Sequence, residues 1–246
     1  YEISACLVGS EMCIRDRILE NRQYQNHLEE MVASQVAEMT RMQDEVITGI
    51  ANLIESRDGS TGLHVKNTQN YVQILTKALR EKGMYPDILD HNYELNTVKA
   101  SVLHDIGKIK TPDAILLKPG RLTDEEFEVM KQHTVAGCEI IDRIIGNVEH
   151  EEYVDIARKI ARYHHERWDG TGYPDGLSGE EIPLCARIMA LADVFDALYQ
   201  DRCYKKAIRP ASKVFEIIKE NSGSQFDPNL TEIFLELQRE ITDISE

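Results

Sequence analysis

Mostly apolar residues near the start of the chain recur at alternating intervals of four and three positions. The positions of this series are Leu28, Val32, Gln35, Met39, Met42, Val46, Gly49 and Leu53. Such heptad spacing places the series on one face of a helix and is typical of a coiled coil. The sequence therefore predicts a long helix, in which residues 18–45 form a linker that pairs with a second copy as a homodimer. The alternative is a helix that packs only on its own domain.

The rest of the chain carries helix start signals and no strand-like alternation. Thr123 is followed three residues later by Glu126, which is the spacing of a capping box. Asp227 precedes Pro228, and this pair is typical of a helix N-terminus. Two segments rich in helix-breaking residues, 111–121 and 168–183, separate the helical stretches. The predicted fold is all-α, with a single helical domain over residues 46–246 after the long N-terminal helix.

Residues 1–17 show neither helical nor strand periodicity. The chain begins with Tyr rather than Met, and its opening closely resembles a translated sequencing-adapter sequence. We expect this stretch to be an artefact or a disordered leader, and otherwise a loop that leaves an upstream domain. The linker helix would then join an upstream domain to the helical domain.

Composition and charge narrow the classes of function. The net charge of −15 argues against general binding to DNA, which is a polyanion. No apolar run approaches the roughly 20 residues that cross a bilayer, so no membrane span is predicted. The five cysteines form no C-x-x-C pair, which favours reduced thiols in the cytoplasm. A small anionic substrate is compatible with this charge if bound cations invert the local field.

The candidate chemistry lies in histidines and aspartates that stand in apolar or glycine-rich contexts. These residues are His64, His104, Asp105, His133, His164, His165 and Asp193. Each one alone could be a hydrogen-bonded core residue or an ion-pair partner, but burying the whole set without partners is costly. Imidazole and carboxylate ligands without clustered cysteines favour Fe, Mn, Zn or Ni. The two oxygens of Asp105 would let it bridge two such ions.

The segments around these residues resemble a known family. The chain contains "RDGSTGLH", "LHDIGK", "KQHTVAG", "YHHERWDGTGYP", "LADVFDAL" and "DRCYK". It is similar in these segments to the HD-GYP family of cyclic di-GMP phosphodiesterases, a branch of the HD metal-dependent phosphohydrolases, from about residue 45 to residue 238. The resemblance implies an HD-type helical domain that hydrolyses cyclic di-GMP to pGpG, GMP or both. It also implies the output domain of a bacterial response regulator, because family members often follow a receiver domain.

The resemblance further implies roles for individual residues. One metal ion would be held by His64, His104, Asp105 and Asp193. The other would be held by Asp105, His133, His164 and His165. Asp105 and Lys108 would be the catalytic residues, and Lys108, Arg202 and Lys205 would contact substrate phosphate. A loop that lines the substrate pocket and docks partner signalling proteins would contain Gly172, Tyr173 and Pro174.

The resemblance also bears on the number of ions. Family members with three ions have a glutamate four residues before the first histidine ligand, and Ser60 occupies that position here. A serine hydroxyl is a poor ligand beside a carboxylate, so we expect two divalent ions, iron or manganese. Two alternatives remain open, namely a cyclic di-GMP sensor without turnover and a phosphohydrolase of another nucleotide.

Overall fold

The structure is a computed structural model that describes residues 2–58, 63–146, 151–200 and 207–245. Within these ranges the regular secondary structure is helical, and the only β-type pairings are two isolated bridges. The α-helices are α1 (Glu2–Glu55), α2 (His64–Glu81), α3 (His91–Ala100), α4 (Asp113–Leu116), α5 (Asp124–Ile145), α6 (Glu151–Tyr163), α7 (Leu184–Tyr199), α8 (Ala211–Glu220), α9 (Pro228–Glu236) and α10 (Gln238–Ser245). The all-α prediction is therefore confirmed for the described part of the chain.

Helix α1 is longer than the sequence predicts. It begins at Glu2 rather than near residue 18, so the expectation of a non-helical leader over residues 1–17 is wrong in its conformation. The stretch contains no proline and a single glycine, and backbone hydrogen bonding in a helix does not require an apolar face. Whether the stretch is an artefact stays a prediction.

The chain divides into two compact units, Tyr1–Val46 and Ile47–Glu246. The first unit is helix α1 up to Val46, and its heptad series is exposed. Val32 is 57% exposed and Met39 is 64% exposed. In the single chain, the apolar face of this linker is therefore exposed to solvent.

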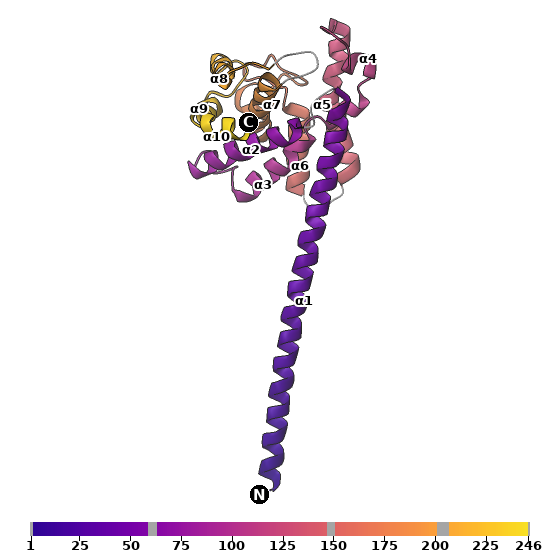
Figure 1. The fold of residues 1–246 in the computed structure, drawn as a ribbon, viewed down its shortest axis with the longest axis vertical. Coiled ribbons are helices and arrows are strands. Elements are labelled where there is room, and N and C mark those ends of the chain that lie inside the picture. Colours follow the sequence, from indigo (N-terminus) through magenta and orange to yellow (C-terminus); the bar gives the residue numbers. More distant parts are fainter. Residues whose placement is uncertain (1, 59–62, 147–150, 201–206, 246) are drawn as a thin grey trace. The chain divides into compact units, whose positions relative to one another are not determined.

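The second unit is the helical domain (Figure 1). Helix α2 packs against α3 and α7, and α6 packs against α3, α5 and α7. Helix α8 packs against α7, helix α9 packs against α2, α7 and α8, and helix α10 packs against α2 and α9. Tyr71, Phe195 and Phe234 are fully buried in the core, where the Tyr71 and Phe195 rings meet edge to face at 5.1 Å. The last turn of α1 adds Ala51 and Ile54 to this core.

Two helix starts follow from local sequence. The hydroxyl of Thr123 accepts a hydrogen bond from the backbone N–H of Glu126, and the Glu126 carboxylate accepts one from the backbone N–H of Thr123. The Asp227 carboxylate accepts hydrogen bonds at the start of α9, where Pro228 is the first residue. Both predicted caps are confirmed, and the first of them fixes the start of a helix that carries His133.

Candidate metal centre

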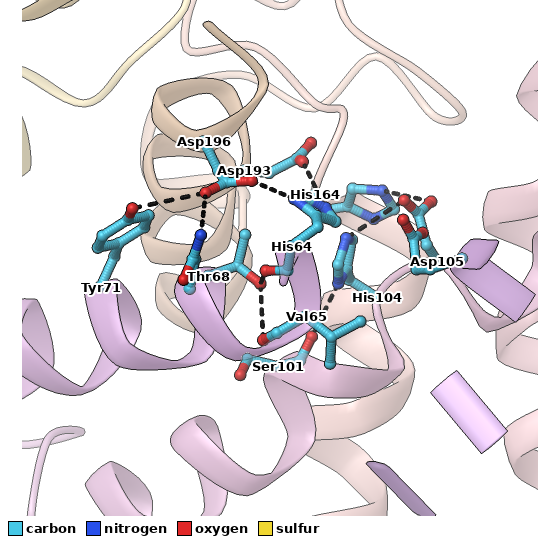
Figure 2. A network of polar contacts seen from close by, with 12 residues as sticks. His64, Val65, Thr68, Tyr71, Ser101, His104, Asp105, His164, Asp193 and Asp196 are labelled. Atoms are coloured by element: carbon cyan, nitrogen blue, oxygen red, sulfur yellow. Dashed lines mark hydrogen bonds and ion pairs between the residues drawn. The ribbon is translucent and has the colours of Figure 1, made fainter. Parts of the chain in front are cut away.

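The seven predicted metal ligands come from separate parts of the helical domain and meet at one place. His64 opens α2, His133 lies within α5 and Asp193 lies within α7. His104 and Asp105 stand between two 3-10 turns, Ser101–Leu103 and Ile106–Lys110, and His164 and His165 directly follow α6. Figure 2 shows His64, His104, Asp105, His164 and Asp193 pointing toward one another.

Asp105 lies between two groups of imidazoles. Its Oδ1 is 3.3 Å from His133 Nε2 and 3.8 Å from His164 Nε2. Its Oδ2 is 3.2 Å from His104 Nε2 and 2.7 Å from Lys108 Nζ. One oxygen therefore faces each group, which is the arrangement that a bridging carboxylate requires.

Backbone carbonyl groups fix the orientation of three of these histidines. The Nδ1 atoms of His104, His133 and His164 lie 2.9, 2.7 and 3.0 Å from the carbonyl oxygens of Ser101, Met130 and Ile160. Because a carbonyl oxygen can only accept, each Nδ1 must carry the hydrogen. In the neutral imidazole the lone pair then lies on Nε2, which is the atom that faces Asp105.

The surroundings of the histidine Nε2 atoms indicate whether the centre fits a cation. Among the described residues, the Nε2 atoms of His64, His104, His133 and His164 are buried and have no hydrogen-bond partner. A buried polar atom without a partner costs free energy, and a lone pair beside a carboxylate oxygen adds repulsion. A divalent ion between these atoms removes both costs, so the donor set fits such an ion.

The charge state of the centre also suits a metal ion. Burial lowers the pKa of His165 to about 4 and holds the pKa of His164 well below its usual value, so both stay neutral. Burial acts to raise the pKa of Asp105, but Lys108 and His104 outweigh it and hold that pKa well below the ordinary range. For His104, burial acts to lower the pKa, yet the adjacent Asp105 carboxylate outweighs burial and raises it to about 9.

Two close groups of candidate ligand atoms share Asp105. Asp105, His133, His164 and His165 form one group, as the sequence predicts. The other group contains His64, His104, Asp105 and a residue that sequence reasoning missed, Glu55. Within each group, the ligand atoms lie within 4.8 Å of one another. Asp193, the remaining predicted ligand, has its Oδ1 3.4 Å from His64 Nε2.

Glu55 is the last residue of α1 and its side chain is only 3% exposed. Its Oε1 lies 3.2 Å from Lys108 Nζ, so Lys108 contacts Glu55 and Asp105 together. The donor set is therefore larger by one carboxylate than the sequence predicts. A signal was available, because Glu55 directly follows the apolar Ile54 at a helix end. Ser60, on which the expected number of ions depends, lies outside the described residues.

Asp196 is a second residue that sequence reasoning missed. It is buried in α7, and its Oδ2 lies 2.7 Å from His64 Nδ1 (Figure 2). Its Oδ1 accepts a hydrogen bond from Asn67 Nδ2 at 3.1 Å. The carboxylate therefore holds the hydrogen of His64 on Nδ1 and leaves Nε2 free to bind a cation. Its position three residues after Asp193 on the same helix is the signal that could have identified it.

Two glycines bring main-chain segments around the centre into direct backbone contact. A Cβ on Gly107 would overlap the carbonyl oxygen of His133 and lie 2.5 Å from Gly137 N. A Cβ on Gly172 would overlap Arg167 N and lie 2.5 Å from the Cα of Glu166. The first contact sets the Asp105 turn against α5, and the second sets the glycine-rich loop against the segment that follows His165.

Gly172, Tyr173 and Pro174 belong to a loop that is held beside the centre. The Glu166 carboxylate accepts hydrogen bonds from the backbone N–H groups of Asp175, Gly176 and Leu177. The Tyr173 ring lies 4.8 Å from the His165 ring. Gly172 and Tyr173 line a cavity of about 260 Å³ next to His164 and His165, whereas Pro174 is not among its lining residues. Arg202 and Lys205, the predicted phosphate contacts, lie outside the described residues.

Comparison with known proteins agrees with this fold and centre. A family model described as HD domain matches residues 26–230. A protein of Vibrio cholerae serotype O1 named "Probable cyclic di-GMP phosphodiesterase" is 41% identical over 235 residues, which cover 94% of this chain and 52% of that protein. A second protein of the same organism, named "Cyclic di-GMP phosphodiesterase", is 44% identical over 211 residues, which cover 85% of this chain and 42% of that protein. The chain thus spans about half the length of these relatives.

A solved structure shows the same fold. The structure of a cyclic GMP-AMP-specific phosphodiesterase from Vibrio cholerae matches with a TM-score of 0.54 and 20% sequence identity. The match covers 81% of this chain and 52% of that chain. The helical fold and the His–Asp centre define a member of the HD domain family. Within that family the chain belongs to the HD-GYP branch.

Proposed function

We propose that this chain is a metal-dependent phosphodiesterase that hydrolyses cyclic di-GMP to pGpG, GMP or both. The observation that carries the proposal is the Asp105 carboxylate, which lies between two groups of buried imidazoles whose Nε2 atoms have no hydrogen-bond partner in the described residues. The names of the two relatives from Vibrio cholerae support cyclic di-GMP as the substrate.

The chain's own residues would hold the ions, orient the substrate phosphate and neutralise the charge that develops on it. Asp105 and the fixed imidazoles would hold two divalent ions, iron or manganese, which would polarise the scissile phosphate and lower the pKa of the attacking water. Lys108 has its ammonium group 2.7 Å from Asp105, where it can donate hydrogen bonds to a phosphate oxygen as charge develops. Arg202 and Lys205 would contact phosphate as well. Elemental analysis of protein purified without oxygen should give two ions per chain, and a third ion beside Glu55 would overturn that number.

A substrate panel tests the proposal. The protein is reconstituted with iron or manganese and offered cyclic di-GMP, cyclic GMP-AMP, pGpG, (p)ppGpp and mononucleotides. We expect turnover of cyclic di-GMP that is lost with the metal. Binding of cyclic di-GMP without turnover would instead identify a sensor. Hydrolysis of only (p)ppGpp or mononucleotides would identify a different phosphohydrolase.

We also propose that the exposed heptad face of α1 pairs with a second copy of the chain. Its support is the series of exposed apolar residues that includes Val32 and Met39. Met39→Asp places a charge within this face, while Ala37→Asp places the same charge on the opposite side of the helix. Sedimentation should show that the first variant dissociates and the second remains dimeric. Equal behaviour of both variants would contradict the proposed interface.

Three further proposals concern the setting of the domain. The chain would act in the cytoplasm as the output domain of a response regulator. The loop that contains Gly172, Tyr173 and Pro174 would also dock signalling proteins. In the described residues, no helix is both long enough and apolar enough to span a membrane.

A further inference from the structure

The cavity next to His164 and His165 has features that the metal centre does not explain. Its volume of about 260 Å³ is below the roughly 300–1,000 Å³ of sites that enclose a drug-sized ligand. It therefore matches one part of a larger ligand. Besides the two histidines, its lining includes two aromatic rings, Phe127 and Tyr173, and the cation Lys131.

Phe127 and Tyr173 present aromatic surface at this cavity. Their ring centroids lie 5.9 Å apart and their planes are inclined by 83°. Phe127 lies in the first turn of α5 and is 43% exposed, although the other four phenylalanines are buried in the core. An exposed aromatic ring beside a second ring is a suitable contact surface for the flat face of a base.

Lys131 places a positive charge above both rings. It lies one helical turn after Phe127, and its Nζ is 4.9 Å from the Phe127 centroid and 5.7 Å from the Tyr173 centroid. The ammonium group also lies 2.6 Å from the carboxylate of Glu128, which is largely exposed. An ammonium group can only donate hydrogen bonds, so a ligand at this place must present an acceptor.

Guanine satisfies these requirements better than adenine does. The O6 and N7 atoms of guanine are both acceptors, whereas adenine has a donor amino group in place of O6. Building on the proposed function, we infer that Phe127, Tyr173 and Lys131 form a guanine subsite for one base of the cyclic dinucleotide. Lys131 donates to the acceptor edge of the base, and the aromatic rings contact its face.

The main test uses Lys131→Met, which removes the charge and keeps a long unbranched side chain. The catalytic efficiency kcat/KM for cyclic di-GMP should fall about tenfold, mainly through KM. The preference for cyclic di-GMP over cyclic di-AMP should shrink by the same factor. Hydrolysis of bis(p-nitrophenyl) phosphate, which has no base, should not change, and Lys131→Arg should restore the preference.

Two further variants sharpen the test. Phe127→Leu removes the ring but keeps apolar bulk, and it should weaken binding of both cyclic dinucleotides by roughly tenfold. Lys159→Met is the matched control, because Lys159 also pairs with an acid on its own helix, Asp155, outside the cavity. This control should behave like the unsubstituted protein.

The outcomes separate the subsite from the proposed function. If the unsubstituted protein neither binds nor hydrolyses cyclic di-GMP, the proposed function fails and the subsite fails with it. If that protein is active and Lys131→Met keeps its guanine preference, only the subsite is overturned. An equal loss toward bis(p-nitrophenyl) phosphate would show that Lys131 acts on the metal centre and not on the base.

Discussion

Asp196→Asn replaces one carboxylate oxygen by an amide nitrogen. The side chain contacts His64 and no other imidazole of the centre. In the structure, Oδ2 of Asp196 accepts a hydrogen bond from His64 Nδ1, and Oδ1 accepts one from Asn67 Nδ2. Asparagine offers only one acceptor oxygen. If that oxygen faces His64, the amide N–H₂ faces the donor group of Asn67. If the amide is turned, its N–H₂ faces His64 Nδ1, and the imidazole must carry its hydrogen on Nε2.

Both orientations of the amide weaken one ion site. The turned amide moves the hydrogen of His64 to the nitrogen that faces the ion, and the other orientation replaces a charged acceptor of the Nδ1 hydrogen by a neutral one, which makes Nε2 a weaker ligand. Partners that orient metal-binding histidines contribute about 10–100-fold in metal affinity. At about 1.4 kcal/mol per factor of ten, the loss is about 1.4–2.8 kcal/mol. Only the ion near His64 should be affected, because the other group of ligands consists of Asp105, His133, His164 and His165. The metal-free variant should stay folded, because the amide has nearly the same volume as the carboxylate and leaves no cavity.

Competition with a chelator measures the effect. The variant should bind one ion with unchanged affinity and a second ion about 10–100-fold more weakly. Asn67→Ala is the control, because it removes a donor to Asp196 and leaves the acceptor that faces His64. Full occupancy of both sites in Asp196→Asn at unchanged affinity would refute the role of Asp196. A loss in Asn67→Ala as large as that in Asp196→Asn would refute it too.

Three more predictions follow from the centre. Asp105→Ala should lose both ions and all turnover, and unchanged metal content by elemental analysis would exclude a bridging carboxylate. Gly107→Ala should lower the free energy of unfolding, measured in urea, by about 3 kcal/mol or more, because the added Cβ meets main-chain atoms of α5. The control is Gly49→Ala, where the added Cβ meets nothing within 4 Å, so this change should be neutral or stabilising. Burial lowers the pKa of His165 to about 4 from 6.5, so between these values the unfolded chain binds more protons than the folded chain. The metal-free protein should therefore lose stability as the pH falls from 6.5 to 4, and a flat profile of urea midpoints would contradict this.

The ligands that could be predicted from sequence are those with a local signal. His104 and Asp105 stand together among apolar residues, and His164 and His165 stand together before a glycine-rich loop. The caps at Thr123 and Asp227 are equally local, because a side chain contacts the backbone of its own helix. Local sequence context suffices to single out candidates of this kind, whereas their assignment to two ions is implied by the family resemblance and stays a prediction.

Glu55 and Asp196 have only weak local signals, and the contacts that give them a role join positions far apart in the chain. Glu55 contacts Lys108, which is 53 positions away in the chain, and Asp196 contacts His64, which is 132 positions away. In sequence, Glu55 is one of many acidic residues at a helix end, and only the fold buries it beside Lys108. The start of α1 at Glu2 was missed for a different reason, because an exposed helix needs no apolar periodicity.

The backbone contacts at Gly107 and Gly172 have a consequence for how such domains diverge. Where two main chains touch, there is no side chain at the contact whose size could change in small steps. Drift in the sequence therefore cannot adjust the separation of the ligand-bearing segments gradually. A descendant of this domain keeps the geometry whole, or it loses one of these glycines and with it the alignment of the candidate ligands nearby. When new sequences are sorted into active and degenerate forms, a glycine at both positions indicates that the backbone arrangement is intact. This criterion is independent of the candidate ligands.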